Sequence, residues 1–306
     1  MTTPSMEQVA CPCPICGAYD CQPLYPDTLG AQLPRLIYDY SPEHMRTYRW
    51  VRCQDCRHAF CSPRPSQLWR LYEDVEDPAY LEFQPNRIAT ASKVLQRIRR
   101  SCAAGRLLDI GCATGDFLSV ARAHFDVEGL ELSRWAAEIA RGKGLLVHES
   151  DLRSFSAERP YDLITLWGVI EHFEEPARDV QKMFELLRPG GIVCVWTGDA
   201  ESWLARLLGK QWWYVQGQHL QLFSRHSLGR VFAAAGFEEV WTGRYPYVTT
   251  VQSLAKGFNR YPAVGPVARR LLSHPLIGTR ALTLTLTLPS ELFALFRRPD
   301  SHGADA

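Results

Sequence analysis

The sequence lacks any long apolar run and any excess of charge of one sign. Its longest uncharged apolar stretch, around residues 281–288, is far shorter than the roughly 18 residues that a membrane-spanning helix needs. The first 17 residues contain neither the basic segment nor the apolar segment of a secretory signal. With 34 Lys and Arg against 33 Asp and Glu, the net charge is +1. This overall charge is too small to bind the phosphate backbone of a nucleic acid. We therefore expect a cytoplasmic protein that is not a nucleic-acid coat.

Nothing in the composition indicates disorder, an internal repeat or a low-complexity tract. The 306 residues are 46% apolar and 22% charged, which is typical of a globular protein that can bury a core. Their number allows two domains of about 100–200 residues each, or one large domain with an appendage.

Cysteine, in contrast, is plentiful and unevenly distributed. Seven of the ten cysteines fall in the first 61 residues. Disulfides do not explain them in a reducing compartment, which keeps thiols free. Two C-x2-C segments, CPICG at 13–17 and CQDCR at 53–57, together supply four thiolates, the ligand set of a tetrahedral structural zinc site. This pattern is similar to a zinc ribbon with ligands Cys13, Cys16, Cys53 and Cys56. Cys11 and Cys61 are spare candidates, and metal-free buried thiols are the alternative.

The segment that carries these cysteines differs in charge from a nucleic-acid-binding module. Residues 1–82 contain seven arginines, no lysine and eleven acidic residues, a net charge of −4, which argues against RNA binding. They are loop-rich and cannot bury much core alone. We expect 1–82 to form a zinc-ribbon-like and linker module, and 83–306 to form the main domain.

From about residue 86 the pattern alternates between helical and strand periodicity. Apolar residues at helical spacing predict a helix over 86–100. Short apolar runs predict strands at 106–111, 126–132, 145–150, 161–167 and 191–197, and helical patterns lie at 115–124, 133–143, 176–188 and 225–235. This alternation predicts βαβ units and a mostly parallel sheet. A strand at 237–241 and a strand pair near 282–296 follow.

The motif LLDIGCATGDF at 107–117 is a strand, a glycine-containing turn and a helix. In an open parallel sheet such a turn lies at the carboxyl edge, where ligands bind. The turn lacks G-x-G-x-x-G, which argues against a pyrophosphate cradle and therefore against a dehydrogenase. Glu131 follows Gly111 by twenty residues, at the end of the next strand, where a carboxylate can accept hydrogen bonds from both hydroxyls of a ribose. Asp151, after the third strand, could meet an adenine amino group.

The series LDIGCATGDF, GLELS, SDL, YDLITLWGVIEH and LLRPGG resembles, in this order, the class I S-adenosylmethionine (SAM)-dependent methyltransferases over roughly residues 84–300. The resemblance implies an α/β fold with a Rossmann-like, doubly wound, mostly parallel sheet, and SAM as the cofactor. It implies that Asp109, Gly111 and Gly115 shape the methionine end of the pocket. Plain turn glycines and a surface acid at Glu131 are the alternative. The cofactor-binding set that the resemblance implies is Asp109, Gly111, Cys112, Ala113, Gly115, Glu131, Leu132, Asp151, Leu152 and Trp167.

The cysteine knuckles ahead of this domain are similar to those of a bacterial group of methyltransferases that act on small molecules in glycan, deoxysugar and natural-product pathways. The likeness extends to TGDAESWLARLLGKQWW and QHLQLFS. It implies methyl transfer from SAM to a small-molecule acceptor, a sugar or natural-product intermediate, and a zinc ion that is structural. Two alternatives stay open: an RNA methyltransferase with a zinc ribbon, and a SAM-binding module without turnover.

Two histidines are candidates for the base that removes a proton from the acceptor. His172 lies in EHFEEP beyond the fourth strand, and His219 lies in the aromatic segment 198–235. The alternative for His172 is a fold feature that bonds the backbone or caps a helix. Aromatic residues around His219 suit a pocket for a sugar ring or a planar acceptor, although core packing explains most of them: Trp203, Trp212, Trp213, Tyr214 and Phe223.

The C-terminal region is basic. From Trp241 to Arg298 there are eight basic residues and one acid, Glu291. A solvated face is the default interpretation. The segment 266–278 could instead contact a membrane surface or an anionic acceptor.

Overall fold

The computed structural model describes residues 8–30, 32–38, 46–251, 254, 266 and 283–300. Three strands from the first part of the chain and one later strand form a small antiparallel sheet in the order β11-β4-β3-β2. Its strands are β2 (Cys21–Tyr25), β3 (Trp50–Cys53), β4 (Ala59–Cys61) and β11 (Gln221–Leu222). A short pair, β1 (Gln8–Val9) with β5 (Arg64–Pro65), lies beside it, and the 3-10 helices η2 (Leu68–Asp74) and η3 (Pro78–Phe83) lead into the main domain.

The main sheet has seven strands in the order β12-β15-β10-β9-β6-β7-β8. The five strands from β10 to β8 are parallel to one another, whereas β15 lies antiparallel between β10 and β12. The predicted mostly parallel α/β sheet is confirmed. Its strands are β6 (Gly105–Ile110), β7 (Phe125–Leu130), β8 (Leu146–His148), β9 (Tyr161–Trp167), β10 (Leu187–Gly198), β12 (Glu238–Gly243) and β15 (Glu291–Arg297).

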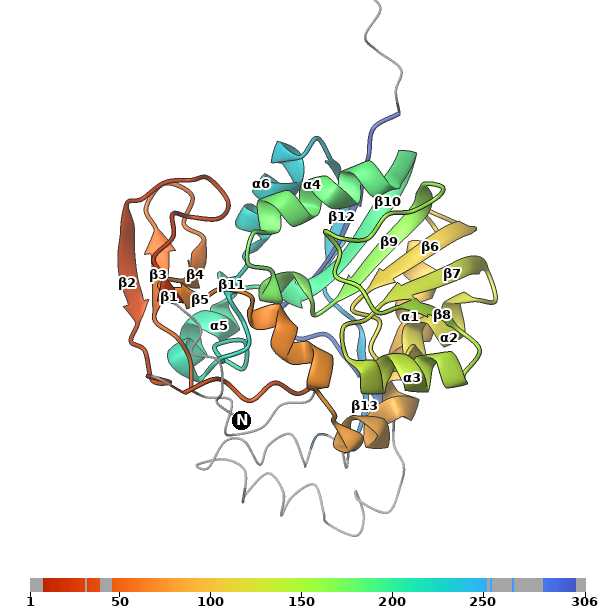
Figure 1. Cartoon of the computed structure of the whole chain (residues 1–306), viewed down its shortest axis with the longest axis horizontal. Helices are drawn as coiled ribbons and strands as arrows, with labels where there is room; N and C mark the ends of the chain where they lie inside the picture. The colour runs from red at the N-terminus through yellow and green to blue at the C-terminus, as the bar shows by residue number, and fades with distance from the viewer. Residues whose placement is uncertain are drawn as a thin grey trace, which may run out of the picture.

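Helices cover both faces of this sheet (Figure 1). One face packs against α1 (Gln84–Ile98), α2 (Asp116–Ala121) and α3 (Arg134–Gly142), whose buried residues share a cluster with alternate residues of the strands. The other face packs against α4 (Pro176–Leu186) and α6 (Arg225–Ala234). Burial on both faces explains why these strands read as nearly continuous apolar runs.

The two late strands do not pair with each other, so the predicted strand pair is wrong. β14 (Thr283–Leu286) pairs with β13 (Tyr247–Thr250), and β15 enters the main sheet. The physical reason is burial: six of the seven residues of β15 are buried, which suits an interior strand, whereas the burial of β14 alternates. Among the described helices, none is long and apolar enough to cross a membrane. The basic segment 266–278, apart from residue 266, lies outside the described residues.

The cysteine-bearing sheet is joined to the segment that precedes α6. In Figure 1 strands β2, β3 and β4 lie beside α5 (Trp203–Leu208) and β11. Strand β4 pairs with β11 in the register Phe60 to Gln221. Buried His58 adds a second link, because its Nδ1 lies 3.1 Å from Ser227 Oγ and its Nε2 lies 2.9 Å from Gln221 Oε1. The small sheet therefore supports residues 221–227, which follow strand β10 of the main sheet.

Candidate functional site

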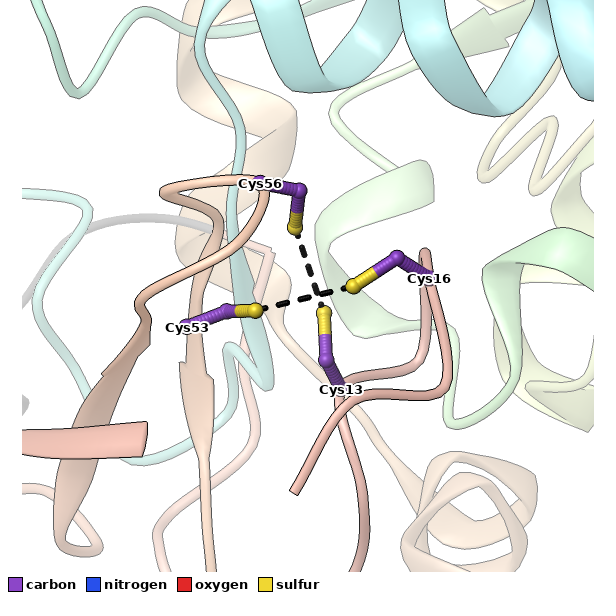
Figure 2. Close-up of side chains that lie close together, drawn as sticks. All are labelled: Cys13, Cys16, Cys53 and Cys56. Atoms are coloured by element: carbon purple, nitrogen blue, oxygen red, sulfur yellow. Dashed lines mark hydrogen bonds between the residues drawn. The ribbon is translucent and has the colours of Figure 1, made fainter. Parts of the chain in front are cut away.

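The four cysteines predicted as zinc ligands converge. Figure 2 shows their sulfur atoms pointing at a common centre from two turns of the chain. Cys13 Sγ lies 3.4 Å from Cys56 Sγ, Cys16 Sγ lies 3.6 Å from Cys53 Sγ, and all four sulfurs lie within 4.8 Å of one another. Zinc bound to four thiolates at about 2.3 Å separates the sulfurs by about 3.8 Å. The cluster therefore has the size that zinc requires.

The surroundings of the cluster act on its thiols in opposite directions: burial raises the pKa of the Cys13 thiol, and raises that of Cys56 to about 11. Burial raises the pKa of the Cys53 thiol, but backbone N–H groups of Cys56 and Asp55 donate to its sulfur and lower the pKa on balance. The spare candidates lie elsewhere: Cys11 Sγ accepts from Arg64 Nη1 at 3.1 Å, and Cys61 Sγ faces the carbonyl oxygen of His219. The geometry therefore separates the four predicted cysteines from the two spares.

A cavity of about 1410 Å³ opens at the carboxyl edge of the parallel strands. Nine of the ten residues predicted to contact the cofactor line it, and only Gly115 does not. Gly115 instead caps α2 with φ +75°, and a Cβ there would lie 2.4 Å from Leu145 Cδ1. Glycine at this position is thus explained by backbone conformation and close helix packing. Gly111 lines the cavity with φ +67°, and a Cβ there would meet Val169 at 2.7 Å.

Both carboxylate oxygens of Glu131 accept hydrogen bonds. Its Oε2 accepts from Ala113 N at 2.7 Å, and its Oε1 accepts from Ser133 N at 2.8 Å and from Tyr38 OH at 3.0 Å. Burial raises the pKa of Glu131, while these donors oppose the rise. A carboxylate has about four acceptor positions, so about one remains for a ligand while Tyr38 is bound.

The methionine end predicted around Asp109 holds two buried atoms that make no hydrogen bond within the described part of the chain, Asp109 Oδ2 and Arg87 Nη2. Asp109 Oδ1 accepts from Thr165 Oγ1 at 2.6 Å, and burial raises the pKa of Asp109 to about 8. Arg87 binds Asp116 Oδ2 through Nε at 2.8 Å and the carbonyl of Tyr80 through Nη1 at 2.6 Å. One free acceptor and one free cationic donor complement the ammonium and the carboxylate of an amino acid.

Asp151 and Leu152 also line the cavity. The Asp151 carboxylate binds its own turn, accepting from Arg153 N at 2.8 Å and Ser154 N at 3.1 Å. Burial raises the pKa of Asp151, but the side chain and the amide of Ser154 lower it on balance. This carboxylate is therefore ionised and shapes the loop after β8.

His172 lies in the cavity wall at the end of the 3-10 helix η4 (Ile170–His172). Its Nδ1 lies 2.8 Å from the carbonyl oxygen of Gln218 and 3.0 Å from Tyr72 OH. A carbonyl only accepts, so we infer that Nδ1 carries the proton and Nε2 is the unprotonated nitrogen. Burial lowers the pKa of His172 to about 4, so the ring is neutral at physiological pH.

His219 lies against His172, with ring centroids 4.7 Å apart and planes at 76°. Its Nδ1 donates to the carbonyl of Tyr214 at 2.8 Å, and its Nε2 accepts from the amide of Gln216 at 2.9 Å. Buried Gln216 Oε1 makes no hydrogen bond among the described residues and faces the same cavity wall. Both predicted histidines are thus in one site, but the basic nitrogen of His219 is already occupied.

The aromatic residues near His219 divide into three groups. Trp213 and Tyr214 line the cavity. Trp212 and Phe223 are buried in the core, as the packing alternative predicts. Trp203 on α5 is 62% exposed, so it neither lines the cavity nor packs in the core.

Sequence reasoning missed four residues of this site: Tyr38, Arg87, Tyr72 and Glu291. Glu291 carried the clearest signal, because it is the only acid in the basic region from Trp241 to Arg298. Arg87 is the second residue of the predicted helix 86–100, and nothing in the sequence distinguishes it from a surface arginine. The two tyrosines lie in a segment without periodicity, which gave no signal.

Comparison with known proteins agrees with this geometry. The sequence model of a family described as "Methyltransferase domain" matches residues 80–242. A ubiquinone biosynthesis O-methyltransferase from Nitrosospira multiformis is 29% identical over 196 residues, which cover 57% of this chain and 81% of the relative. One of the same name from Aromatoleum aromaticum is 30% identical over 171 residues, covering 49% and 71%.

Among solved structures, a chain of a complex that contains the Haloferax volcanii Trm112 methyltransferase activator matches 72% of this chain and 95% of that chain. The TM-score is 0.51 at 13% sequence identity, so this likeness concerns the fold alone. The family match covers more than half of the chain and includes the strands and turns that line the cavity. The chain therefore belongs to the methyltransferase-domain family, and it is a SAM-dependent methyltransferase.

Proposed function

We propose that this enzyme transfers a methyl group from SAM to a small-molecule acceptor, a sugar or natural-product intermediate. One observation supports this most directly: a single cavity of about 1410 Å³ joins the cofactor-side residues around Glu131 to His172 and an aromatic wall. Ligand pockets typically measure about 300–1,000 Å³, so this cavity has room for an acceptor beside the cofactor. The relatives named ubiquinone biosynthesis O-methyltransferase support a small organic acceptor.

The residues present fit SAM. Asp109 Oδ2 would bind the ammonium and Arg87 Nη2 the carboxylate of its methionine part, Glu131 the ribose, and the loop Asp151–Leu152 the adenine. Gly111, Cys112, Ala113, Leu132 and Trp167 complete this half of the cavity. Bound SAM supplies a methyl group activated by the sulfonium. The protein's contribution is to hold the acceptor in line with that group.

His172 Nε2 is the base in this proposal. Its Nδ1 proton is fixed by the Gln218 carbonyl, which orients the ring and leaves Nε2 to take a proton from the acceptor. Burial lowers its pKa to about 4, so it takes that proton only as the acceptor atom forms its bond to the methyl group. His219 supports the ring of His172 and becomes a second base only if Gln216 moves.

The four-cysteine cluster holds a structural zinc ion in this proposal. The four sulfurs form a closed set, which leaves no open position for chemistry. The metal stabilises the small sheet from which β4 pairs with β11.

A turnover assay tests the proposed function. The enzyme is incubated with SAM and panels of deoxysugar, phenolic and polyketide acceptors, and formation of S-adenosylhomocysteine is measured against a parallel reaction with RNA. We expect turnover with a small acceptor and none with RNA. Turnover with RNA alone, lost at raised salt together with RNA binding, would overturn the proposal in favour of an RNA methyltransferase.

A further inference from the structure

The walls of the cavity carry far more acid than base. The described lining includes ten Asp and Glu residues, three arginines and no lysine. Arg87 pairs with Asp116 and Arg153 pairs with Asp179, and outside these two pairs the lining holds eight acids and one arginine. An acidic cavity attracts cations and repels anions such as phosphate. The charge of the cavity therefore favours an acceptor with a positive charge over one with a negative charge.

Two of these acids, Glu171 and Glu291, have no ion-pair partner among the residues that the structure describes, and no described cation is among the causes of the pKa shift of either carboxyl. They are only 2% and 6% exposed. Glu171 Oε2 accepts from Thr197 Oγ1 at 3.0 Å. The Glu291 carboxyl disfavours the charged form of Glu171, because it raises the pKa of Glu171 beyond the effect of burial. Ionising a buried carboxyl without a cation nearby is costly, and a cationic ligand would offset that cost.

Gly168, whose φ of +68° favours glycine, borders the space between Glu171 and Trp196. A Cβ built on Gly168 would lie 3.6 Å from Glu171 Oε1 and 3.4 Å from Trp196 Cζ3. A carboxylate oxygen and an aromatic ring thus border the same small space, and Gly168 lines the cavity. We call this space, bounded by Gly168, Glu171 and Trp196, the amine subsite.

Aromatic rings continue the wall beyond the amine subsite. Trp196 stacks on Tyr245 with ring centroids 4.3 Å apart. Glu291 accepts hydrogen bonds from Trp196 Nε1 at 2.7 Å, Tyr214 OH at 3.0 Å and Trp213 Nε1 at 3.2 Å. The polar edges of these rings therefore point at Glu291. Ring faces attract a cation within about 6 Å of the centroid.

We propose that the amine subsite binds a protonated amine carried by the acceptor. The ammonium donates to Glu171 Oε1, and the field of Glu291 and the ring of Trp196 stabilise its charge. The role is one of binding, so no bond forms or breaks at the amine. This inference rests on the proposed function, and it narrows the acceptor to amine-bearing molecules.

Binding of a matched pair of probes tests the inference. 2-Phenylethylamine and 2-phenylethanol differ only in the amine and the hydroxyl. Each is titrated calorimetrically into the purified enzyme at neutral pH, with and without saturating S-adenosylhomocysteine. We expect the amine to bind at least about tenfold more tightly than the alcohol. Glu171→Gln and Glu291→Gln keep the side-chain shape but cannot ionise when the amine binds, and each should reduce this preference to below about threefold.

Glu239→Gln is the matched control, because Glu239 pairs with Arg225 away from the cavity; it should keep the full preference. Equal binding of the two probes by the unmodified enzyme would overturn the inference, and so would a preference that persists in both cavity variants. If Glu291→Gln lowers Tm so far that it does not fold, Glu171→Gln and the unmodified enzyme decide.

Binding of S-adenosylhomocysteine in the same samples separates the two proposals. A protein that binds it but shows no amine preference retains the proposed function and lacks the subsite. A protein that prefers the amine but binds no S-adenosylhomocysteine contradicts the proposed function, while the subsite stands on the probe pair alone.

Discussion

The amide of Cys61 donates to the carbonyl of Leu220 at 2.9 Å, and this bond ties strand β4 to the chain next to a candidate catalytic histidine. Cys61 Sγ also faces the carbonyl of His219, 3.5 Å away. Strand β4 follows directly from the turn that carries Cys53 and Cys56, and it pairs with β11. The small sheet therefore connects the cysteine cluster to the acceptor side of the cavity.

Loss of metal should therefore loosen the acceptor side before the cofactor side. In Cys16→Ser, or after chelation of the bound metal, we expect faster amide hydrogen exchange at residues 220–222. Binding of S-adenosylhomocysteine should change less than about threefold, because the main sheet has its own core. Hydrogen exchange by mass spectrometry, with metal content measured on the same sample, checks this. We expect about one zinc per chain in the unmodified protein.

Cys102→Ser is the matched control for that experiment, since Cys102 lies outside the cluster. Unchanged exchange at residues 220–222 in a metal-free sample would show that β11 does not depend on the cluster.

Replacing Glu131 should abolish tight cofactor binding. Glu131→Gln cannot accept all of the donors that now reach its two oxygens, and it loses the charge that strengthens bonds to ribose hydroxyls. A hydrogen bond to a charged group contributes about 1.5–3 kcal/mol, so we expect affinity for S-adenosylhomocysteine to fall at least about tenfold. Calorimetric titration measures it. Glu149→Gln, a half-exposed partner of Arg141, should bind normally; similar losses in both variants would disprove a specific role of Glu131.

The two histidines should differ in their effect on turnover. His172→Ala removes the proposed base and should reduce the rate about 10²- to 10⁴-fold. His219→Ala should have a smaller effect, because its Nε2 is already bound by Gln216. Single-turnover kinetics with saturating SAM distinguish the rates from binding. An unchanged rate in both single variants and in the double variant would mean that alignment of the acceptor alone suffices.

The buried carboxyls should make stability fall as pH rises. Burial raises the pKa of Asp109 and Glu171 to about 8 and that of Glu291 to about 7. An unfolded carboxyl titrates near pH 4. Between about pH 4 and pH 8 the folded protein thus holds protons that the unfolded chain has lost, which lowers the free energy of unfolding with increasing pH.

Glu171→Gln isolates this effect. It removes one of the three carboxyls, so the Tm of the variant minus that of the unmodified protein should increase from pH 6.5 to pH 8.5 by about 2–4 °C for each kcal/mol gained. Scanning calorimetry without ligand at constant ionic strength measures it. Below pH 6.5 the buried neutral His58 and His172 contribute an opposite slope, because burial lowers the pKa of each to about 4. A pH-independent difference would contradict a raised pKa at Glu171.

The cofactor half of the cavity could be predicted from the sequence because it is local. Each functional residue there comes directly after a strand, as Gly111 comes after β6 and Glu131 after β7. Because the strands are parallel, the residues that follow them lie at one edge of the sheet. Cysteine spacing was equally informative, since a C-x2-C turn already places two sulfurs together.

The acceptor half could not be predicted, because its residues meet only through tertiary packing. The Tyr72 hydroxyl is within hydrogen-bond distance of His172, 100 positions later in the sequence. Trp196 donates a hydrogen bond to Glu291, 95 positions later. Neither pair has a spacing that a motif could encode. The wrong pairing of the late strands has the same origin, since the partner of β15 is β10, far away in the chain.

The antiparallel strand β15 has a consequence for the order in which the molecule is made. Its first residue, Glu291, stands at the carboxyl edge of its parallel neighbours only because the strand runs against them. A ribosome releases the cofactor half of the sheet long before it releases this residue, and β12 has no partner within the main sheet until β15 arrives. The nascent chain thus passes through a stage with the cofactor residues in place and the acceptor wall without Glu291, when β10 is an edge strand with unpaired backbone groups.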